Sequence, residues 1–228
     1  MINSLLVVIL ICCLFFAFRG LSRIKLSPLL NPLLLCIALI STLLLVLDVD
    51  YQTFFIAAKP LHFFLEIAVV ALAYPLYLQF HDIKFYFLHI LVCSFIGVTS
   101  ATLLAFTLCE VFSVHEQLSA SLAALSVTTP ITILISAELG GINAIAAVMV
   151  ILVGMFGGIF GISLLRLLNI THPKVMGIAL GVSCHAIGTA SAIEYHPTAG
   201  AYASAAMTIS AVTTAIWVPP FYTWLSVL

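Results

Sequence analysis

The sequence predicts an all-α, polytopic transmembrane protein with about six full spans and two broken, re-entrant helical hairpins arranged as an inverted repeat. Hydrophobic residues make up 64% of the 228 residues and charged residues only 7%, which is more apolar surface than a soluble core buries. Long apolar segments recur along the chain, and two of them are interrupted by polar patches. At roughly 20 residues per crossing, we expect a single integral membrane domain over residues 1–228.

Composition also narrows the class of function. The net charge of −1 argues against a nucleic-acid partner. The six cysteines show no C-x-x-C spacing, so neither a metal site nor a disulfide framework is expected. No motif pairs a nucleophile with a base, and the sequence predicts neither an enzyme nor a cofactor. The expected surroundings are a lipid bilayer.

Residues 1–108 are predicted to form a four-helix part, with helices at 5–18, 32–47, 61–77 and 85–108. The positive charges that follow the first helix, Arg19, Arg23 and Lys25, favour a cytoplasmic loop and hence an N-terminus outside. Lys59 is expected in an outer loop and residues 81–84 in an inner one. Glu66 lies within the third helix and is a candidate for coupling to a proton or cation.

Two polar, helix-breaking patches organise the rest of the chain. The first reads Ser126-Val127-Thr128-Thr129-Pro130 and continues to Glu138-Leu139-Gly140-Gly141. The second runs from Gly181 through Ser183, Cys184 and His185 to Gly188-Thr189-Ala190. Irregular backbone at membrane depth survives only where protein or a water-filled cavity satisfies its hydrogen bonds. Broken helices in corresponding positions of two repeats are the usual indication of a transporter's binding site.

Each patch lies between short apolar arms and is followed by one long helix, giving hairpin-plus-helix repeats at 117–165 and 175–226. The arms 117–127 and 131–139 are roughly 16 and 13 Å long as helices, against a hydrocarbon core of about 30 Å. A re-entrant hairpin would leave Arg166 and Lys174 in the cytoplasm, as the positive-inside rule prefers. The alternative is one broken crossing helix per patch, with eight spans and a parallel repeat.

Thr129-Pro130 is a helix-start signature, with Thr129 as N-cap and Pro130 at the first helical position. The half-helix that follows would direct free amides at the midplane, which suits an anion. In the second patch Gly188 is expected to break the helix and Thr189 to cap the next arm. The competing interpretation is that both patches are packed structural kinks. The candidate substrate-binding residues are Ser126, Thr128, Thr129, Pro130, Ser183, His185, Gly188 and Thr189.

His185 lies in the second polar break and is a candidate for substrate binding or proton transfer, because its ordinary pKa is near physiological pH. A neutral histidine bonded across helices is the alternative. The helix at 142–165 carries a stripe of glycines at Gly154, Gly157, Gly158 and Gly161, spaced as G-x-x-x-G pairs. Such a stripe predicts close packing within the chain, or otherwise the face of a homodimer.

These motifs together resemble the LrgB/CidB family of bacterial membrane proteins, whose relatives include a plastid carrier. The resemblance covers nearly the whole chain through Pro28–Pro32, Val70–Tyr77, the two patches and the Glu138–Gly141 run. The chain departs from the family pattern at Leu125 and Ser191, where members commonly have Lys and Arg, and at Glu66-Ile67. Two expected cations are therefore absent from the patches.

The resemblance implies a protein of the bacterial inner membrane that works with a small LrgA/CidA-type membrane protein. It also implies movement of a small carboxylate such as glycolate, glycerate or pyruvate, linked to control of murein hydrolases and autolysis. The alternative is a non-transporting holin- or antiholin-like regulator that acts by oligomerisation.

Overall fold

The computed structural model describes residues 4–24, 32–71 and 73–227, and every regular element in these ranges is an α-helix. The all-α prediction is therefore confirmed for the described part. The chain divides into two compact units, residues 1–71 and 72–228.

The first unit contains three helices, α1 (Ser4–Ile24), α2 (Pro32–Val46) and α3 (Tyr51–Ala71), and α1 packs against both of the others. The expected outer loop around Lys59 is wrong, because α3 begins eight residues before Lys59 and runs through Pro60 without interruption. The Asp50 carboxylate accepts a hydrogen bond from the Thr53 amide, which helps to start α3 this early. Glu66 lies on α3, and its side chain is outside the described part of the structure.

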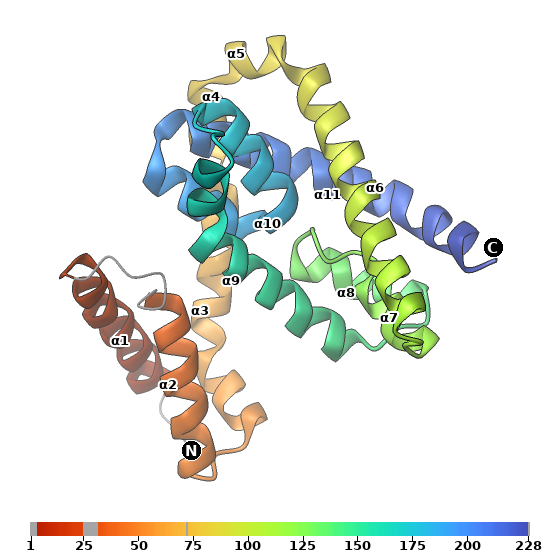
Figure 1. Ribbon diagram of the computed structural model, residues 1–228. Coiled ribbons are helices and arrows are strands. Elements are labelled where there is room, and N and C mark those ends of the chain that lie inside the picture. Colours follow the sequence, from red (N-terminus) through yellow and green to blue (C-terminus); the bar gives the residue numbers. More distant parts are fainter. Residues whose placement is uncertain (1–3, 25–31, 72, 228) are drawn as a thin grey trace. The chain divides into compact units, whose positions relative to one another are not determined.

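The second unit contains the remaining helices (Figure 1). The expected inner loop at 81–84 is instead a short helix, and the helix expected at 61–77 ends at Ala71. In order, the helices are α4 (Ala73–Leu78), α5 (Phe80–Phe85), α6 (Phe87–Val111), α7 (Glu116–Leu122), α8 (Thr129–Glu138), α9 (Asn143–Leu167), α10 (Pro173–Tyr195) and α11 (Pro197–Ser226).

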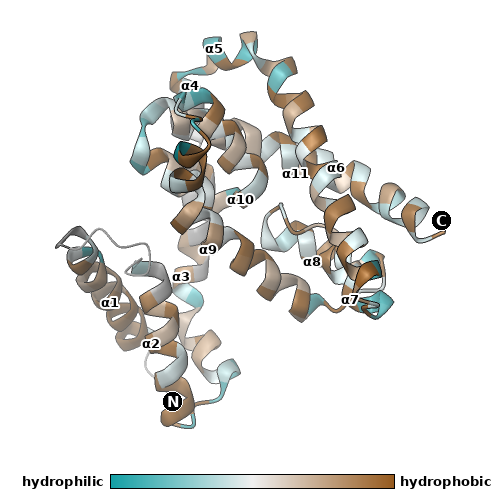
Figure 2. Ribbon diagram, in the orientation of Figure 1, coloured by the Kyte–Doolittle hydropathy of each residue, from teal (hydrophilic) through white to brown (hydrophobic). Residues whose placement is uncertain are grey.

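Five helices of the described residues are long and apolar enough to cross a membrane: α1, α6, α9, α10 and α11. Figure 2 shows apolar residues running along α1 and α9. Large apolar side chains stand exposed on these helices, among them Leu104 and Phe156, each 60% exposed. An apolar surface of this kind requires lipid around it rather than water. The count of five differs from the six full spans expected from the sequence.

Helices α6 and α11 run side by side in the same direction. Phe95 meets Trp217 with ring centroids 5.0 Å apart, and further along both helices Phe106 meets Tyr222 at 5.6 Å. The Trp217 indole N–H donates to the Thr99 hydroxyl at 3.0 Å. This pair of helices forms the support on which the two interrupted segments pack.

The chain reverses direction within α10. Gly177 and Gly181, one turn apart, lie directly against the backbone of Ala199 and Ala203, also one turn apart, on α11. The first half of α10 therefore runs parallel to the start of α11. Because only His196 separates the two helices, the second half of α10 must lead back to where the first half began.

A polar cluster holds the starts of α10 and α11 against α5. Lys174 forms an ion pair with Asp82 at 2.6 Å, and the Tyr202 hydroxyl donates to the same carboxylate at 2.7 Å. The Lys174 ammonium also lies 4.4 Å from the centre of the Tyr86 ring. Its hydrogen bond to Asp82, aided by that of Tyr202, holds the pKa of the Asp82 carboxyl below its usual value. Asp82 and Lys174 thus lie at the same end of this unit.

Candidate functional site

The first predicted patch is an interruption between two short helices. Helix α7 ends at Leu122, and α8 begins only at Thr129. The carbonyl groups freed by this interruption are satisfied by threonines, since Thr102 of α6 donates to the Ala123 carbonyl and Thr132 to that of Ala124, both at 2.8 Å. Both threonines are buried, and the interruption is therefore a built part of the fold.

The start of α8 lies one residue earlier than the sequence signature indicated. Thr128, not Thr129, is the N-cap, and its side chain makes no capping hydrogen bond. Pro130 lies in the first turn as predicted, and the Ile131 amide already bonds to the Thr128 carbonyl at 3.0 Å. Because proline lacks an N–H, this helix start offers fewer backbone donors to an anion than an ordinary one.

The Glu138–Gly141 run closes α8. The Gly141 amide bonds to the Ser136 carbonyl at 2.7 Å and the Gly140 amide to that of Ala137 at 3.4 Å, which is a Schellman motif. Gly140 has φ +77°, a conformation in which side chains are strained. The Ser121 hydroxyl then accepts a hydrogen bond from the Ile142 amide at 2.7 Å, so that α7 packs onto the start of α9.

The second patch is interrupted at Cys184 and His185, with φ −129° and φ 40°. The prediction that Gly188 breaks the helix is therefore wrong, because the break comes three residues before it. Gly188 serves the reversal differently: a methyl group there would lie 2.6 Å from the Cys184 Cβ and 2.7 Å from the Leu180 carbonyl. Only a glycine allows the returning backbone to approach that closely.

His185 is buried, at 4% exposure, and bridges α10 to α9. Its Nε2 lies 3.1 Å from the Val150 carbonyl, which can only accept, so Nε2 carries the proton and Nδ1 is left as an acceptor. A methyl group at Gly154 would lie 2.6 Å from the ring. A positive φ at a non-glycine residue costs about 1–3 kcal/mol, and such strain concentrates at binding sites.

The other candidate residues lie in three environments. Ser126 is buried, Thr128 and Thr129 are half-buried, and Pro130 is exposed. Ser183 is exposed and donates to the Ala179 carbonyl of its own helix at 2.6 Å. Thr189 is buried within the helix and does not cap an arm; its hydroxyl contacts the Met207 sulfur at 3.7 Å.

The glycine stripe of α9 faces α10. A methyl group at Gly158 would lie 2.7 Å from Ile187, and one at Gly157 would overlap the Cys184 sulfur. Gly154 faces the His185 ring, and Gly161 faces Leu180. All four glycines therefore bring α9 close to the interrupted helix of the same chain.

Both interruptions pack on α6, on neighbouring turns of that helix. Thr102 bonds to the Ala123 carbonyl of the first, while Val182, just before the second, meets Gly97. A methyl group at Gly97 would lie 2.6 Å from Val182. Among the described residues, no hydrogen bond joins one patch to the other.

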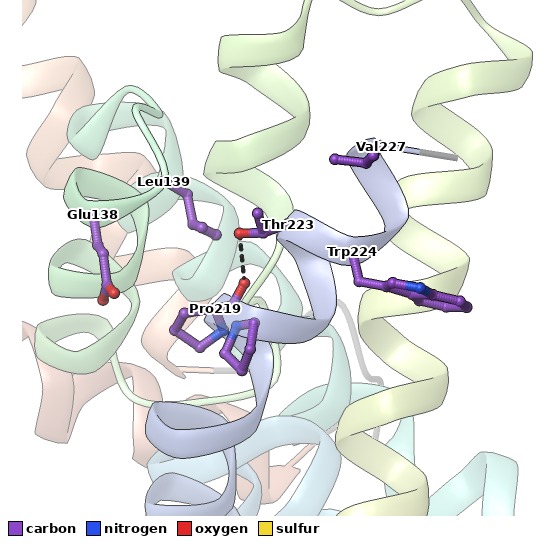
Figure 3. A pocket seen from close by; sticks show the side chains of 7 residues that line it. Glu138, Leu139, Pro219, Thr223, Trp224 and Val227 are labelled. Carbon is purple, nitrogen blue, oxygen red and sulfur yellow. Dashed lines mark hydrogen bonds between the residues drawn. The ribbon is translucent and has the colours of Figure 1, made fainter.

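Two openings adjoin these segments. An apolar groove of ≈ 650 Å³ between α9 and α10 reaches Gly157, Ser183 and Cys184 at the second interruption. A pocket of ≈ 660 Å³ lies beyond the end of α8, between Glu138 and the Pro219-Pro220 step of α11 (Figure 3).

Several residues that complete the patches carry no recognisable sequence signal. Thr102, Gly97 and the Val150 carbonyl lie in uniformly apolar helices, far along the chain from the residues they contact. In the ranges that the structure describes, no group of three metal-ligating side chains occurs.

These features define the class of protein: a multi-pass, helical membrane protein with two interrupted segments packed on a common pair of helices. Residues 11–224 match the LrgB-like family, and the chain belongs to that family. It is 34% identical over 198 residues to the uncharacterized protein YxaC of Bacillus subtilis, covering 87% of this chain and 86% of YxaC.

Two further relatives carry descriptive names. The holin-like protein CidB of Staphylococcus epidermidis is 31% identical over 218 residues, covering 96% of this chain and 95% of CidB. The antiholin-like protein LrgB of Bacillus cereus is 30% identical over 191 residues, covering 84% of this chain and 83% of LrgB. No solved structure matches the chain.

Proposed function

We propose that this protein is a secondary transporter of small monocarboxylates and that its two interrupted helices form the substrate path. The observation that carries the proposal is that both pack on neighbouring turns of α6, with His185 buried at a positive φ in the second interruption. A helix-only pore or scaffold needs no interrupted segments, whereas a carrier uses them to present polar groups at mid-membrane.

The proposed topology has both interrupted segments as re-entrant hairpins of an inverted repeat, with the N-terminus outside. The Asp82–Lys174 ion pair supports it, because α6 leaves from the Asp82 end and α9 must return to that end before α10 begins. The segment of α7 and α8 then turns back without crossing. The reversal within α10 supports the same arrangement for the second repeat.

The site would carry its substrate together with a proton. No lysine or arginine occurs between Lys84 and Arg166, so both the first patch and the α9 wall of the second lack a cation. Moving an unpaired carboxylate into an apolar site is costly, and a proton bound by the protein beside it would supply the missing positive charge. In this proposal the acceptor Nδ1 of His185 receives the proton, while the Thr129 hydroxyl binds the carboxyl group. Glu66 is the second candidate for coupling.

Uptake of labelled glycolate, glycerate and pyruvate into proteoliposomes under an imposed pH gradient tests this proposal. His185→Gln retains a donor for the Val150 carbonyl but cannot titrate, so uptake should lose its response to the gradient. Thr129→Val removes a hydrogen bond to a charged group, about 1.5–3 kcal/mol, and should weaken apparent affinity roughly ten- to hundredfold.

Ser100→Ala is the matched control, because Ser100 is exposed on α6 and bonds only to the Gly97 carbonyl of its own helix. It should transport like the unmodified protein. Wild-type transport by well-folded Thr129→Val and His185→Gln variants would refute the proposed site.

The names of the relatives favour a second candidate function, a holin- or antiholin-like regulator of murein hydrolases and autolysis. In this form the protein would act with a small LrgA/CidA-type membrane partner or as a homodimer. A regulator of this kind would give non-saturable leakage of unrelated dyes from proteoliposomes. Saturable, acid-selective uptake without dye leakage would favour the transporter.

A further inference from the structure

The apolar groove between α9 and α10 runs lengthwise along two candidate membrane spans. On α9 its lining residues extend from Leu152 to Leu165, about 20 Å along the helix axis. On α10 they extend from Ala179 to Cys184, where that helix is interrupted. The groove is therefore long, and its inner end lies at the break in α10.

Charged side chains at the other end of the groove place it in one leaflet of the bilayer. Arg166 directly follows the last groove residue of α9, and Lys174 lies shortly before the first groove residue of α10. Long cationic side chains near the ends of membrane helices lie at the membrane surface. One leaflet of the hydrocarbon core is roughly 15 Å thick, so a groove about 20 Å long leads from the surface to the middle of the bilayer.

The lining of the groove suits an occupant that is apolar along its whole length. None of its lining residues is charged, and only Ser183 and Cys184 carry a polar side-chain group. The Ser183 hydroxyl donates to the Ala179 carbonyl at 2.6 Å, and the Cys184 sulfur lies 3.1 Å from it. A hydroxyl has one proton to donate, so that of Ser183 is already used within its own helix.

A groove of this kind inside a bilayer has to be filled by apolar material. Apolar cavities stay dry, and a wall without partner atoms loses its van der Waals contacts. Leu152, Phe156 and Leu164 line the groove and are exposed, so the described helices leave this surface uncovered.

The width of the groove distinguishes between the two apolar occupants that a membrane offers, a second protein helix and a lipid chain. A volume of ≈ 650 Å³ spread over about 20 Å gives a mean cross-section of about 30 Å². An α-helix about 10 Å across has a cross-section of roughly 80 Å². A helix from a second copy of the protein is therefore too wide, whereas a single hydrocarbon chain is much thinner than a helix.

We propose that this groove binds one acyl chain of a bilayer phospholipid, with the headgroup at the membrane surface and the methyl end of the chain at Cys184. Phe156 and Leu164 cover the chain from the side of α9, and Ala179 supports it from α10. The methyl end then packs beside the break at His185. This site does not depend on the transport proposed above, because it requires only that α9 and α10 span the bilayer.

The test uses the full-length protein in phosphatidylcholine vesicles that contain a small fraction of a photoactivatable phosphatidylcholine. One form of this probe carries a diazirine close to the headgroup end of an acyl chain, and a second form carries it at the methyl end. Mass spectrometry identifies the labelled residues after illumination. The first form should label Leu164 and Leu165, and the second should label Leu152 and Phe156.

Leu104 provides the comparison with ordinary surrounding lipid, because it lies on α6 and is as exposed as Phe156, at 60%. Labelling of the groove should saturate as the fraction of probe rises, whereas labelling of Leu104 should rise in proportion. Proportional labelling at both places, or the same labelled residues with both probes, would overturn the proposal.

Ala179→Phe should place a ring in the groove. Because the ring and the chain cannot share the same space, saturable labelling at a low probe fraction should fall roughly tenfold or more. Ala190→Phe is the matched control, because Ala190 is exposed on the same helix and does not line the groove. Phe156→Ala changes an exposed position, where folding tolerates the loss, and should cause a partial loss of saturable labelling.

Unchanged labelling in both folded groove variants would contradict the proposal. An unlabelled groove in a protein that native mass spectrometry shows to be a dimer would assign this face to a second copy instead. Displacement of the probe by pyruvate would assign the groove to a transport substrate and would equally rule out a resident lipid chain.

Discussion

The contact between Gly157 and Cys184 gives the sharpest test of how α9 packs on the interrupted helix. Gly157→Ala would place a methyl group on the Cys184 sulfur and 2.5 Å from its Cβ, whereas ordinary contact begins near 3.4 Å. The two helices would have to separate or the cysteine would have to rotate. Overpacking of this kind costs about 1–3 kcal/mol. Replacing a helical glycine by alanine otherwise gains about 0.5–1 kcal/mol, so we expect a net loss near 1 kcal/mol.

The assay is equilibrium unfolding in mixed micelles of neutral detergent and dodecyl sulfate, followed by the fluorescence of Trp217 and Trp224. Gly161→Ala is the control, because its methyl group would meet only the flexible end of Leu180 at 2.5 Å and the leucine can move aside. Adding Cys184→Ala to Gly157→Ala removes the overlapping sulfur. The Cys184 Cβ position still lies 2.5 Å from the added methyl group, so the double variant should recover part of the loss, roughly 0.5 kcal/mol, relative to the sum of the single changes.

Additive effects in this cycle would refute the reasoning, because they would mean that the two side chains do not meet. Equal losses in Gly157→Ala and Gly161→Ala would also count against it, since only the first contact involves atoms close to the backbone of the break.

Three further predictions concern the rest of the second unit. Gly181→Ala should destabilise more than Gly157→Ala in the same assay, because its methyl group would meet backbone on α11 that no rotamer change can move. Asp82→Asn should remove the ion pair with Lys174. Because pairing lowers the pKa of Asp82, the pair should stabilise the protein above about pH 4 and lose this effect as the pH falls below that value. Thermal scans at different pH should show this dependence in the unmodified protein and not in the variant. In a cysteine-free background, Thr171→Cys should resist an impermeant thiol reagent in intact cells while Gln117→Cys reacts, and labelling of both positions would favour eight spans.

Local chemistry predicted much of the second unit. Proline in the first turn of α8 and the paired glycines after Glu138 were recognisable because their backbone preferences act within one turn. Helix α9 begins and ends within two residues of the expected range 142–165, because a long apolar run defines it.

The place of the second break could not be predicted in this way. Glycine has the weakest helical preference in the patch apart from proline, which favoured Gly188, yet the break lies at His185, with φ 40°. A contact 35 residues away, from the ring to the Val150 carbonyl, helps to hold that conformation. Such a contact has no signature in a single sequence. The interruption before α8 is similar, because the freed Ala123 carbonyl accepts a hydrogen bond from Thr102, which belongs to another helix.

The glycine contacts of α10 with α11 have a consequence for motion. At Gly177 and Gly181 the two backbones touch without intervening side chains, so neither helix can slide or roll on the other without collision. They therefore move as one rigid body that carries the His185 reversal with it. Any exposure of the interruptions to alternating sides has to occur by displacement of this body against α9 and α6, where side chains such as Ile187 and Val182 form the contact and can change rotamer.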